Sequence, residues 1–466
     1  MRKFLTQFLI YGCASMLSKI AAIFLMPLYT GVLTTGEYGA MAMINSCSAV
    51  IGILANLNIH SGIARDYFEK GVDRKKLVST GFFSILLCSV FIALIVFLTR
   101  NQWINMLKLQ SYKVAFILMI ADLPTVSLQS YFAILTRYKN KPVLFLIGSV
   151  SQLMVQIGTA VYLVLIRQIG VEGIFVASLV ANIYGTVFFL IVNREFINFT
   201  FDKAILRKAL VFSIPTLPAI LAWWIDTSLG QVLIGKYVSY DVLGVYSVAL
   251  SITSVFSLIT IAFKNVWGPY LYENYQREGF LREANNLYKL FFLLLVIISV
   301  NLSLMAEEVV LILSQPTYID AVKYITLLCF PLSIYMLHPF FSSGISLSRK
   351  TKYTSLANCV GSAVNLLLLV IFLPHFGVIV APLSLATSRL INFYISKYYS
   401  QRALNLNLRG SWMFIFMGIL AVCYFINDID LPRVSVWCGL LVADVLTAVY
   451  FIRHFKLKKI IEMFKK

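Results

Sequence analysis

Five charged residues lie deep within long apolar segments of this 466-residue sequence. Lys19 is in the middle of segment 4–30, and Asp122, Asp226, Arg389 and Asp444 lie within four others. A charge at the centre of a bilayer costs on the order of 2.5–3.5 kcal/mol on insertion scales, so such residues face water-filled cavities or ionic partners. The pattern predicts ion or anion binding inside a membrane.

Two of these charges are cations suited to an anionic group. We predict that Lys19 and Arg389 contact such a group, since a guanidinium can bond two phosphate oxygens at once. The alternatives are a structural ion pair of Lys19 with Asp226 or Asp122, and an Arg389 side chain that extends towards the membrane surface. We interpret Asp226 and Asp122 as proton or sodium sites, or as counter-ions to the basic pair. Asp444 is assigned a structural role or a protonated, lipid-facing one.

The apolar segments are long enough to position these charges inside a bilayer. The sequence is 60% hydrophobic and 13% charged, against about 25% charged residues in a soluble domain. The apolar runs have the length of about 20 residues that a spanning helix needs. They predict an all-α polytopic membrane protein with about fourteen transmembrane helices, at 4–30, 39–62, 77–99, 112–134, 143–166, 171–192, 210–234, 241–263, 287–305, 321–341, 353–373, 377–397, 411–427 and 434–452.

The basic residues predict an orientation for these helices. If the N-terminus is cytoplasmic, thirty of the thirty-nine Lys and Arg residues fall on the inner face and seven on the outer face, and Lys19 and Arg389 lie within spans. This is the asymmetry of the positive-inside rule. We therefore expect a multi-pass protein of the bacterial inner membrane with both termini cytoplasmic. The net charge of +19 then reflects topology, and no nucleic-acid partner is predicted.

The sequence also repeats itself at an offset of about 204–207 residues. Gly36–Gly39 and Val242–Tyr246 open the second and eighth spans, and Asn182 corresponds to Arg389. Six spans per repeat give two bundles in the same orientation, related by a pseudo-two-fold axis, with a substrate site between them. The predicted domains are the bundles 1–205 and 206–400, followed by two additional helices and a basic tail at 401–466.

Two tryptophans and a charged connector are further candidates. Trp223 and Trp224 follow two prolines in the seventh span and are interpreted as sugar contacts, with anchoring at the membrane interface as the alternative. Arg65, Tyr67 and Glu69 follow the second span and are interpreted as a cytoplasmic gate, with ordinary inner-face charge as the alternative.

The sequence contains no pattern typical of a catalytic or metal site. The seven cysteines lie in apolar runs without metal-ligand spacing, and there is no phosphate-binding loop for ATP. We therefore predict neither an enzyme nor a bound cofactor. Coupling of transport to a proton or sodium gradient is compatible with this prediction.

Several short motifs, in this order, resemble a known family. They are the L-x-x-x-E-Y-G turn at Leu33–Gly39, the R-D-Y-F-E connector at Arg65–Glu69, the segment Leu210–Pro218 followed by Asp226, and Lys264–Pro269. With the fourteen spans and the repeat, they look like the Wzx-type O-antigen and capsule flippases of the multidrug/oligosaccharidyl-lipid/polysaccharide exporter superfamily.

The resemblance implies a function. Such proteins move an undecaprenyl-pyrophosphate-linked oligosaccharide repeat unit from the cytoplasmic to the periplasmic leaflet, by alternating access of two bundles around a cationic cavity. Lys19 lies where family members often carry a basic residue. The implied partners are the lipid-linked oligosaccharide, membrane lipids, and the polymerase and chain-length proteins of the same pathway.

Three other functions were weighed. A drug/cation antiporter of the same superfamily usually has twelve spans and acidic cavity residues. A polysaccharide polymerase is expected to carry a large periplasmic loop, whereas the longest predicted outer loop has under about twenty residues. A scaffold for an envelope assembly complex does not require deep charges.

Overall fold

The computed structural model describes residues 23–69, 71–139, 141–348, 350, 352–404, 406, 412–429 and 432–454. Within these residues the chain is helical and contains no strand. The all-α polytopic class predicted from the sequence is confirmed. Ten stretches are long and apolar enough to cross a membrane, and one of them, Lys352–Gln401, holds two successive helices. Three shorter apolar helices, Ile23–Val32, Trp412–Asp428 and Arg433–Val442, lie outside these stretches.

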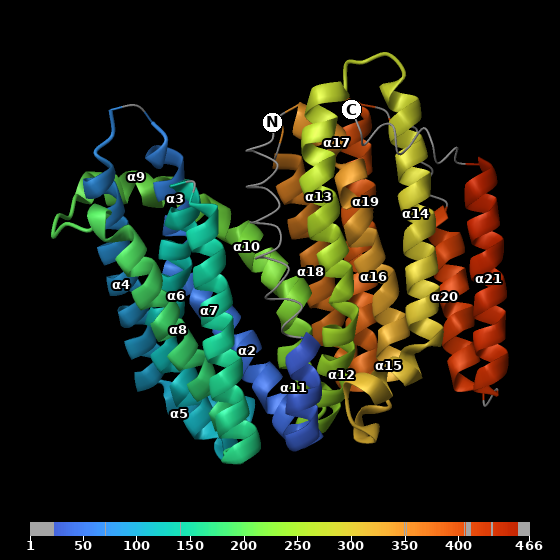
Figure 1. Ribbon diagram of the computed structural model, residues 1–466, viewed down its shortest axis with the longest axis horizontal. Helices are drawn as coiled ribbons and strands as arrows, with labels where there is room; N and C mark the ends of the chain where they lie inside the picture. Colours follow the sequence, from blue (N-terminus) through green and yellow to red (C-terminus); the bar gives the residue numbers. More distant parts are fainter. Residues whose placement is uncertain are drawn as a thin grey trace. The chain divides into compact units, whose positions relative to one another are not determined.

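The chain separates into two compact units, and we describe each by itself. Unit 1 comprises Met1–Ser251, Leu313–Tyr318 and Asn358–Ser384. Its main helices are α2 (Thr35–Asn56), α3 (Ile59–Tyr67), α4 (Arg74–Leu98), α5 (Arg100–Leu107), α6 (Lys113–Tyr138), α7 (Pro142–Ala160), α8 (Val171–Asn193), α9 (Lys203–Ser213), α10 (Leu217–Trp224), α11 (Gly230–Tyr237), nearly all of α12 (Tyr240–Thr253) and most of α18 (Lys352–Phe376). Figure 1 shows α4, α6, α7 and α8 running alongside one another.

Unit 2 comprises Ile252–Ile312, Ile319–Ala357 and Leu385–Lys466. Its helices are α13 (Val255–Asn274), α14 (Phe280–Leu304), α15 (Ala306–Leu313), α16 (Ala321–Phe341), α17 (Ser343–Leu347), most of α19 (Val380–Gln401), α20 (Trp412–Asp428) and α21 (Arg433–His454). Aromatic rings fill its core: the Phe263 and Phe291 centroids are 4.2 Å apart, and those of Phe341 and Phe393 are 4.0 Å apart. The predicted division at 205 and 400 describes the internal repeat, and it stays a prediction.

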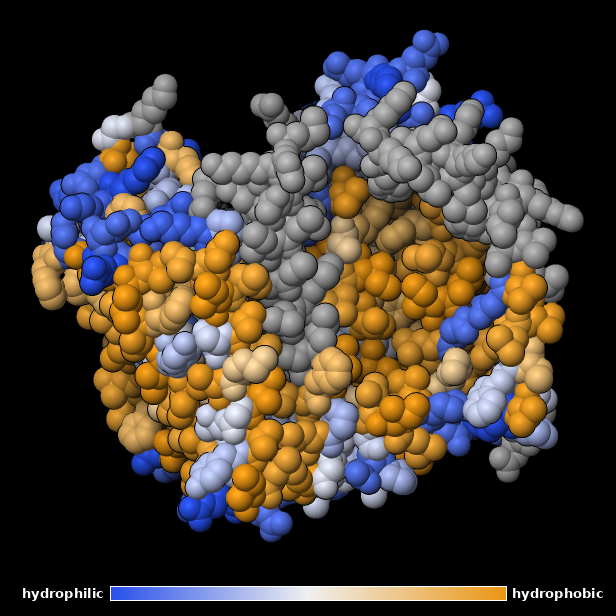
Figure 2. All heavy atoms as spheres, in the orientation of Figure 1, coloured by the Kyte–Doolittle hydropathy of each residue, from blue (hydrophilic) through white to orange (hydrophobic). Residues whose placement is uncertain are grey.

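The helices of unit 1 carry apolar side chains on their outer surface. On α4 the side chains of Leu87, Phe91 and Leu98 are more than half exposed. Figure 2 shows apolar side chains over the middle of the helices of this unit and hydrophilic ones gathered near their ends. A helix satisfies its own backbone hydrogen bonds, so only its side chains need to suit the hydrocarbon. This is the surface of a multi-pass membrane protein.

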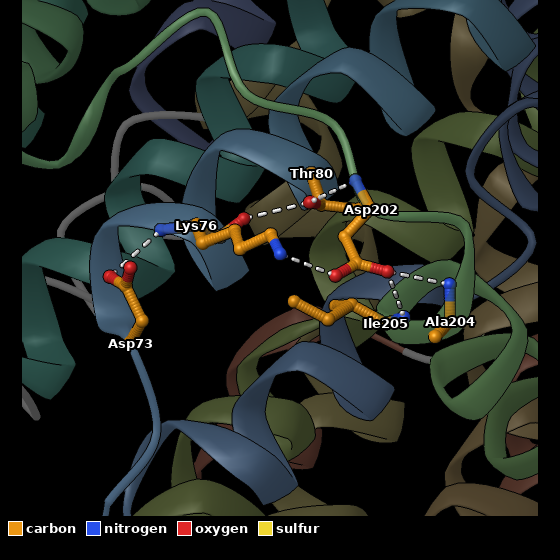
Figure 3. A network of polar contacts seen from close by, with 6 residues as sticks. All are labelled: Asp73, Lys76, Thr80, Asp202, Ala204 and Ile205. Carbon is orange, nitrogen blue, oxygen red and sulfur yellow. Dashed lines mark hydrogen bonds and ion pairs between the residues drawn. The ribbon is translucent and has the colours of Figure 1, made fainter.

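Short polar side chains start the helices at the unit 1 surface. Asp73 caps α4 by accepting hydrogen bonds from the backbone N–H groups of Lys75 and Lys76 at 3.0 and 3.2 Å, and Asp202 caps α9 by accepting from Ala204 N–H at 2.7 Å. Lys76 Nζ then lies 2.7 Å from Asp202 Oδ2 (Figure 3). The two helix starts are thereby held together.

The seventh predicted span is interrupted in the structure. Pro215 lies in a 3₁₀ turn between α9 and α10, and a π-helical turn at Ile225–Leu229 separates α10 from α11. A proline removes one backbone donor and clashes with the preceding turn, and single π turns occur often at functional sites. The irregular backbone places Asp226 within the π turn.

Candidate functional site

A cationic cluster lies in unit 2, formed by Lys264 of α13, Tyr335 of α16 and Arg389 of α19. The guanidinium carbon of Arg389 is 4.8 Å from the centroid of the Tyr335 ring. Lys264 Nζ is 4.3 Å from the same centroid and donates a 3.0 Å hydrogen bond to the phenol oxygen. Each cation is attracted by the negative face of the ring. Tyr335 thus holds two positive charges close together.

The two cations of the cationic cluster differ in burial. Arg389 is 8% exposed, whereas Lys264 is exposed. An ammonium group has three N–H donors, and the bond to Tyr335 uses one of them. His338, one turn after Tyr335, has its Nε2 3.3 Å from Ser396 Oγ of α19. The cationic cluster therefore combines a buried guanidinium with an ammonium group that a ligand can reach.

Asp226 is held by an amide within unit 1. It is 9% exposed, and Asn365 of α18 donates a 3.0 Å hydrogen bond from Nδ2 to Asp226 Oδ1. The Asn365 oxygen is buried and has no hydrogen-bond partner among the described residues. The pair presents a carboxylate and a carbonyl oxygen, which are acceptors suited to a cation.

Asp122 of α6 ends a chain of polar side chains in unit 1. Asp122 Oδ1 accepts a 2.5 Å bond from Thr125 Oγ1, and Oδ2 accepts a 2.7 Å bond from Asn182 Nδ2 of α8. Gln152 of α7 donates to the Asn182 oxygen at 3.0 Å. The deep carboxylate predicted from the sequence is therefore fully hydrogen-bonded by neutral groups, because each of its oxygens has a donor.

The two tryptophans have different surroundings. Trp224 donates from Nε1 to the backbone oxygen of Ser46 at 3.0 Å, so its polar edge is engaged by α2. Trp223 is 54% exposed. A role for either ring in sugar contact stays a prediction.

The connector residues tie α3 to α9 in unit 1. Lys208 Nζ lies 3.1 Å from Asp66 Oδ2 and 3.2 Å from Glu69 Oε2. The Arg65 guanidinium carbon lies 5.2 Å from the centroid of Phe212, and Tyr67 is 3% exposed within the core. Asp66 and Lys208 were not singled out in the sequence. The predicted gate role of Arg65, Tyr67 and Glu69 stays a prediction.

The helices α2 and α12 cross at backbone contact in unit 1. A Cβ atom on Gly39 would lie 1.9 Å from the Tyr240 carbonyl oxygen, and one on Gly244 would lie 2.0 Å from that of Thr35. Gly39 and Gly244 are 205 residues apart in the sequence, as are Thr35 and Tyr240. The contact is thus reciprocal between equivalent positions of the repeat, and only glycine fits at either position.

Lys19 lies outside the described residues. Asp444 of α21 accepts a 3.0 Å hydrogen bond from Asn301 Nδ2 of α14 in unit 2, and its role stays a prediction.

A family model described as "polysaccharide biosynthesis protein" matches residues 30–323, well over half of the chain. The chain belongs to this family. As a polysaccharide biosynthesis protein, it matches the pathway that the sequence motifs imply. A search among curated proteins found no significant match.

This polysaccharide biosynthesis protein has the fold of known transporters. It is similar to the lipid II flippase MurJ in an inward closed conformation, with 16% identity, a TM-score of 0.71, and coverage of 96% of this chain and 99% of that one. A multidrug resistance MATE family transporter of the MOP superfamily in an inward-facing conformation has 13% identity and a TM-score of 0.68, with 84% and 95% covered. A MOP superfamily transporter from Pyrococcus furiosus has 14% identity and a TM-score of 0.53, with 87% and 96% covered.

The sequence reasoning missed the lysine of the cationic cluster in this polysaccharide biosynthesis protein. It ended the eighth span at residue 263 and so placed Lys264 in a loop, whereas α13 runs through Lys264 to Asn274. The available signal was its place in the motif Lys264–Pro269, after a run that carries no charge between Asp241 and Lys264. The sequence also did not indicate Asn182, Gln152 or Asn365 as partners of the two carboxylates.

Proposed function

We propose that this protein is a flippase for a lipid-linked oligosaccharide. The substrate is an undecaprenyl-pyrophosphate-linked repeat unit, moved from the cytoplasmic to the periplasmic leaflet of the bacterial inner membrane for the synthesis of O-antigen, capsule or exopolysaccharide. The proposal is supported by the polysaccharide biosynthesis family, by the fold that it shares with a lipid II flippase, and above all by the cationic cluster in unit 2.

The cationic cluster suits a pyrophosphate. Charge-assisted bonds from guanidinium and ammonium groups to phosphate are roughly twice as strong as neutral ones, and Arg389 and Lys264 provide one group of each kind. Cations at membrane depth mark substrate pathways. Tyr335 keeps the two positive charges together before the anion arrives, which lowers the cost of binding. We assign Lys19 to the same anionic group.

We propose that the protein works by alternating access of its two repeats. The reciprocal crossing at Gly39 and Gly244 lies at the start of the second and eighth spans, which the predicted orientation places on the outer face. Release of the substrate on that side then requires α2 and α12 to separate. Arg65, Tyr67 and Glu69 lie at the opposite, inner end, in keeping with a cytoplasmic gate.

A cysteine pair tests this outer crossing. Thr35 Oγ1 donates a 2.6 Å hydrogen bond to Asp241 Oδ1, so Thr35→Cys together with Asp241→Cys brings two thiols into reach. Oxidation is expected to stop transport, and reduction to restore it. Thr35→Cys alone is the control. Full transport by the oxidised pair would contradict an outer gate at this crossing.

The carboxylates have a separate proposed role. Asp226, beside the free oxygen of Asn365, is the counter-ion to Lys19 or a site for the coupling cation. Asp122, surrounded by neutral donors, is a candidate for carrying a proton or sodium ion. Sugar contact is assigned to Trp223 and Trp224. Polymerase and chain-length proteins are the partners expected downstream.

Complementation tests the function. The gene is deleted and returned as the wild type, Lys264→Gln or Lys323→Gln, and lipid-linked repeat units are assayed on each side of the inner membrane. Lys323 is the matched control because it is an exposed lysine of unit 2 outside the cationic cluster. We expect deletion and Lys264→Gln to leave complete repeat units on the cytoplasmic leaflet, and Lys323→Gln to restore surface glycan.

Two other results would identify a different function. Unpolymerised repeat units on the outer leaflet of the deletion strain would indicate a polymerase. Unchanged surface glycan with altered drug sensitivity would indicate an antiporter, which is the second candidate because the hydrogen-bonded Asp122 is a plausible proton site in a fold shared with a multidrug transporter.

A further inference from the structure

A polar groove of about 400 Å³ lies along α6 and α7 of unit 1. Its hydrogen-bonding side chains are those of Gln129, Ser130, Arg137, Ser149, Gln152 and Gln156. Its volume is in the range of small-molecule sites. None of these residues belongs to the cationic cluster or to the pair of Asp226 and Asn365.

The groove lies on helices that are otherwise apolar. Both belong to stretches that can span a membrane, Gln110–Tyr138 and Pro142–Ile166. An amide moved from water into an apolar medium without a partner costs roughly 2–7 kcal/mol, so three glutamines on one groove are expensive unless water or a ligand meets them. The composition of the groove therefore points to a polar occupant.

The amides form a directed hydrogen-bond chain. Ser130 Oγ donates to the Gln129 oxygen at 3.4 Å, Gln129 donates to the Gln152 oxygen at 2.8 Å, and Gln152 donates in turn to Asn182, which donates to Asp122. An ionised carboxylate can only accept, so Asp122 orients every amide in the chain. Chains of this kind strengthen each member.

Each glutamine of the groove retains unused hydrogen-bonding capacity. An amide group has two N–H donors and two acceptor lone pairs, and the chain uses one donor of Gln129 and one of Gln152. Gln156 makes no side-chain hydrogen bond within the described part of the chain. Oriented amides that offer both a donor and an acceptor match a hydroxyl group, which is itself both.

We propose that this groove binds the hydroxyl groups of the saccharide part of the substrate. Arg137 marks one end of the groove, with its guanidinium carbon 4.7 Å from the centroid of Phe145. Glutamine and serine side chains form most of the polar lining, so the groove suits hydroxyl groups. The anionic pyrophosphate is expected to bind to the cationic cluster instead. The proposal rests on the proposed function and adds a second, separate subsite to it.

Binding of two lipids to the full-length protein in nanodiscs tests this subsite. The probes are undecaprenyl pyrophosphate and the lipid-linked oligosaccharide extracted from the deletion strain. We expect the wild type to bind the oligosaccharide lipid about tenfold more tightly, as loss of a few hydrogen bonds predicts. Gln129→Leu with Gln152→Leu is expected to reduce this preference to below twofold and to leave binding of undecaprenyl pyrophosphate unchanged.

Two further variants protect the test against misfolding. Gln156→Leu leaves the chain to Asp122 intact and is expected to reduce the preference about threefold. Gln110→Leu makes the same substitution near the far end of α6, outside the groove, and is expected to keep the full preference. A tenfold preference retained by both groove variants overturns the subsite alone. A wild type that binds neither lipid overturns the proposed function and the subsite together.

Discussion

Asp122 in unit 1 and Arg389 in unit 2 are both charges within membrane spans, yet their surroundings are of opposite kinds. Asp122 is held by a hydroxyl and an amide, at 2.5 and 2.7 Å, and three more polar side chains extend that chain. Arg389 shares an aromatic ring with a second cation. The carboxylate is thus neutralised by dipoles, while the guanidinium has another positive charge nearby.

The repeat makes this contrast sharper. Asn182 and Arg389 occupy corresponding positions in the two halves of the sequence. In unit 1 the position donates a neutral amide hydrogen bond to Asp122, and in unit 2 it provides a buried cation over Tyr335. Two like charges near one ring repel each other unless an anion joins them. Under the proposed function, unit 2 receives the anionic part of the substrate and unit 1 its neutral polar part.

Removing one cation is expected to have the largest effect. A hydrogen bond to a charged group contributes about 1.5–3 kcal/mol, so Lys264→Gln and Arg389→Gln should each lower the rate of lipid-linked oligosaccharide transport roughly ten- to hundredfold. Transport is measured as arrival of the oligosaccharide on the outer leaflet. Arg389→Lys should recover part of the rate, because it restores charge without the planar fork.

The control for the charge effect is Lys323→Gln, which removes an exposed lysine from the same unit and should leave transport within twofold of the wild type. An equal loss in all three variants would mean that net charge, and not the cationic cluster, governs transport.

Substitution of Asp122 is expected to lower stability in addition to any effect on transport. Asp122→Leu leaves the Nδ2 donor of Asn182 without its acceptor, whereas Thr125 Oγ1 keeps its 2.8 Å bond to the backbone oxygen of residue 122. An unsatisfied polar group away from water costs about 1–3 kcal/mol. We expect a loss of about 1–3 kcal/mol in the free energy of unfolding, measured by thermal unfolding of the purified protein in detergent. Asp122→Asn retains an acceptor for one of the two donors and should lose less than half as much. Equal losses would show that charge, and not hydrogen bonding, stabilises the chain of amides.

Two substitutions of Tyr335 distinguish the contribution of its ring from that of its hydroxyl group. Tyr335→Phe keeps the ring beneath both cations and removes only the acceptor of the Lys264 hydrogen bond, at a cost of about 0.5–1.5 kcal/mol, or roughly two- to tenfold in transport rate. Tyr335→Leu also removes the ring and should approach the effect of Arg389→Gln. A Phe variant as inactive as the Leu variant would assign the whole role of Tyr335 to its hydroxyl group.

The fold could be predicted from the sequence to a large extent. Hydropathy sets most of the spanning helices, because only helices satisfy their backbone in lipid, but the second and seventh predicted spans are interrupted in the structure. A further exception is the end of the eighth predicted span, near Lys264. That exception arises because a lysine after an apolar run reads as a loop, whereas α13 continues through it to Asn274.

The site was less predictable, for a physical reason. A charge at membrane depth stands out by type, so Arg389, Asp226 and Asp122 were recognised. Their partners Asn182 and Asn365 are neutral amides on other helices, and which amide meets which carboxylate depends on how the helices pack. In the sequence, the reciprocal contact of Gly39 and Gly244 appeared only as a repeated motif. A close approach of two helix backbones is indicated in a sequence only by the glycines that permit it.

Substitution of the surface ion pair between Lys76 and Asp202 in unit 1 is expected to have the smallest effect on stability, against which the other effects can be compared. The hydrogen bond from Lys76, followed by that from the Ala204 N–H, lowers the pKa of Asp202 below its usual range. A carboxyl group with a lowered pKa in the folded state stabilises the protein above its unfolded pKa of about 3.9, and this stabilisation is lost as the pH falls through the folded value. Asp202→Asn should therefore lower the melting temperature slightly at pH 7 and not at all at low pH. Lys76→Gln, which removes the same pair from the other side, should show the same pH dependence. Surface ion pairs contribute little to stability because water screens them. A decrease in melting temperature as large as that caused by Asp122→Leu would therefore contradict the argument that charges within the spans matter more because they are less exposed.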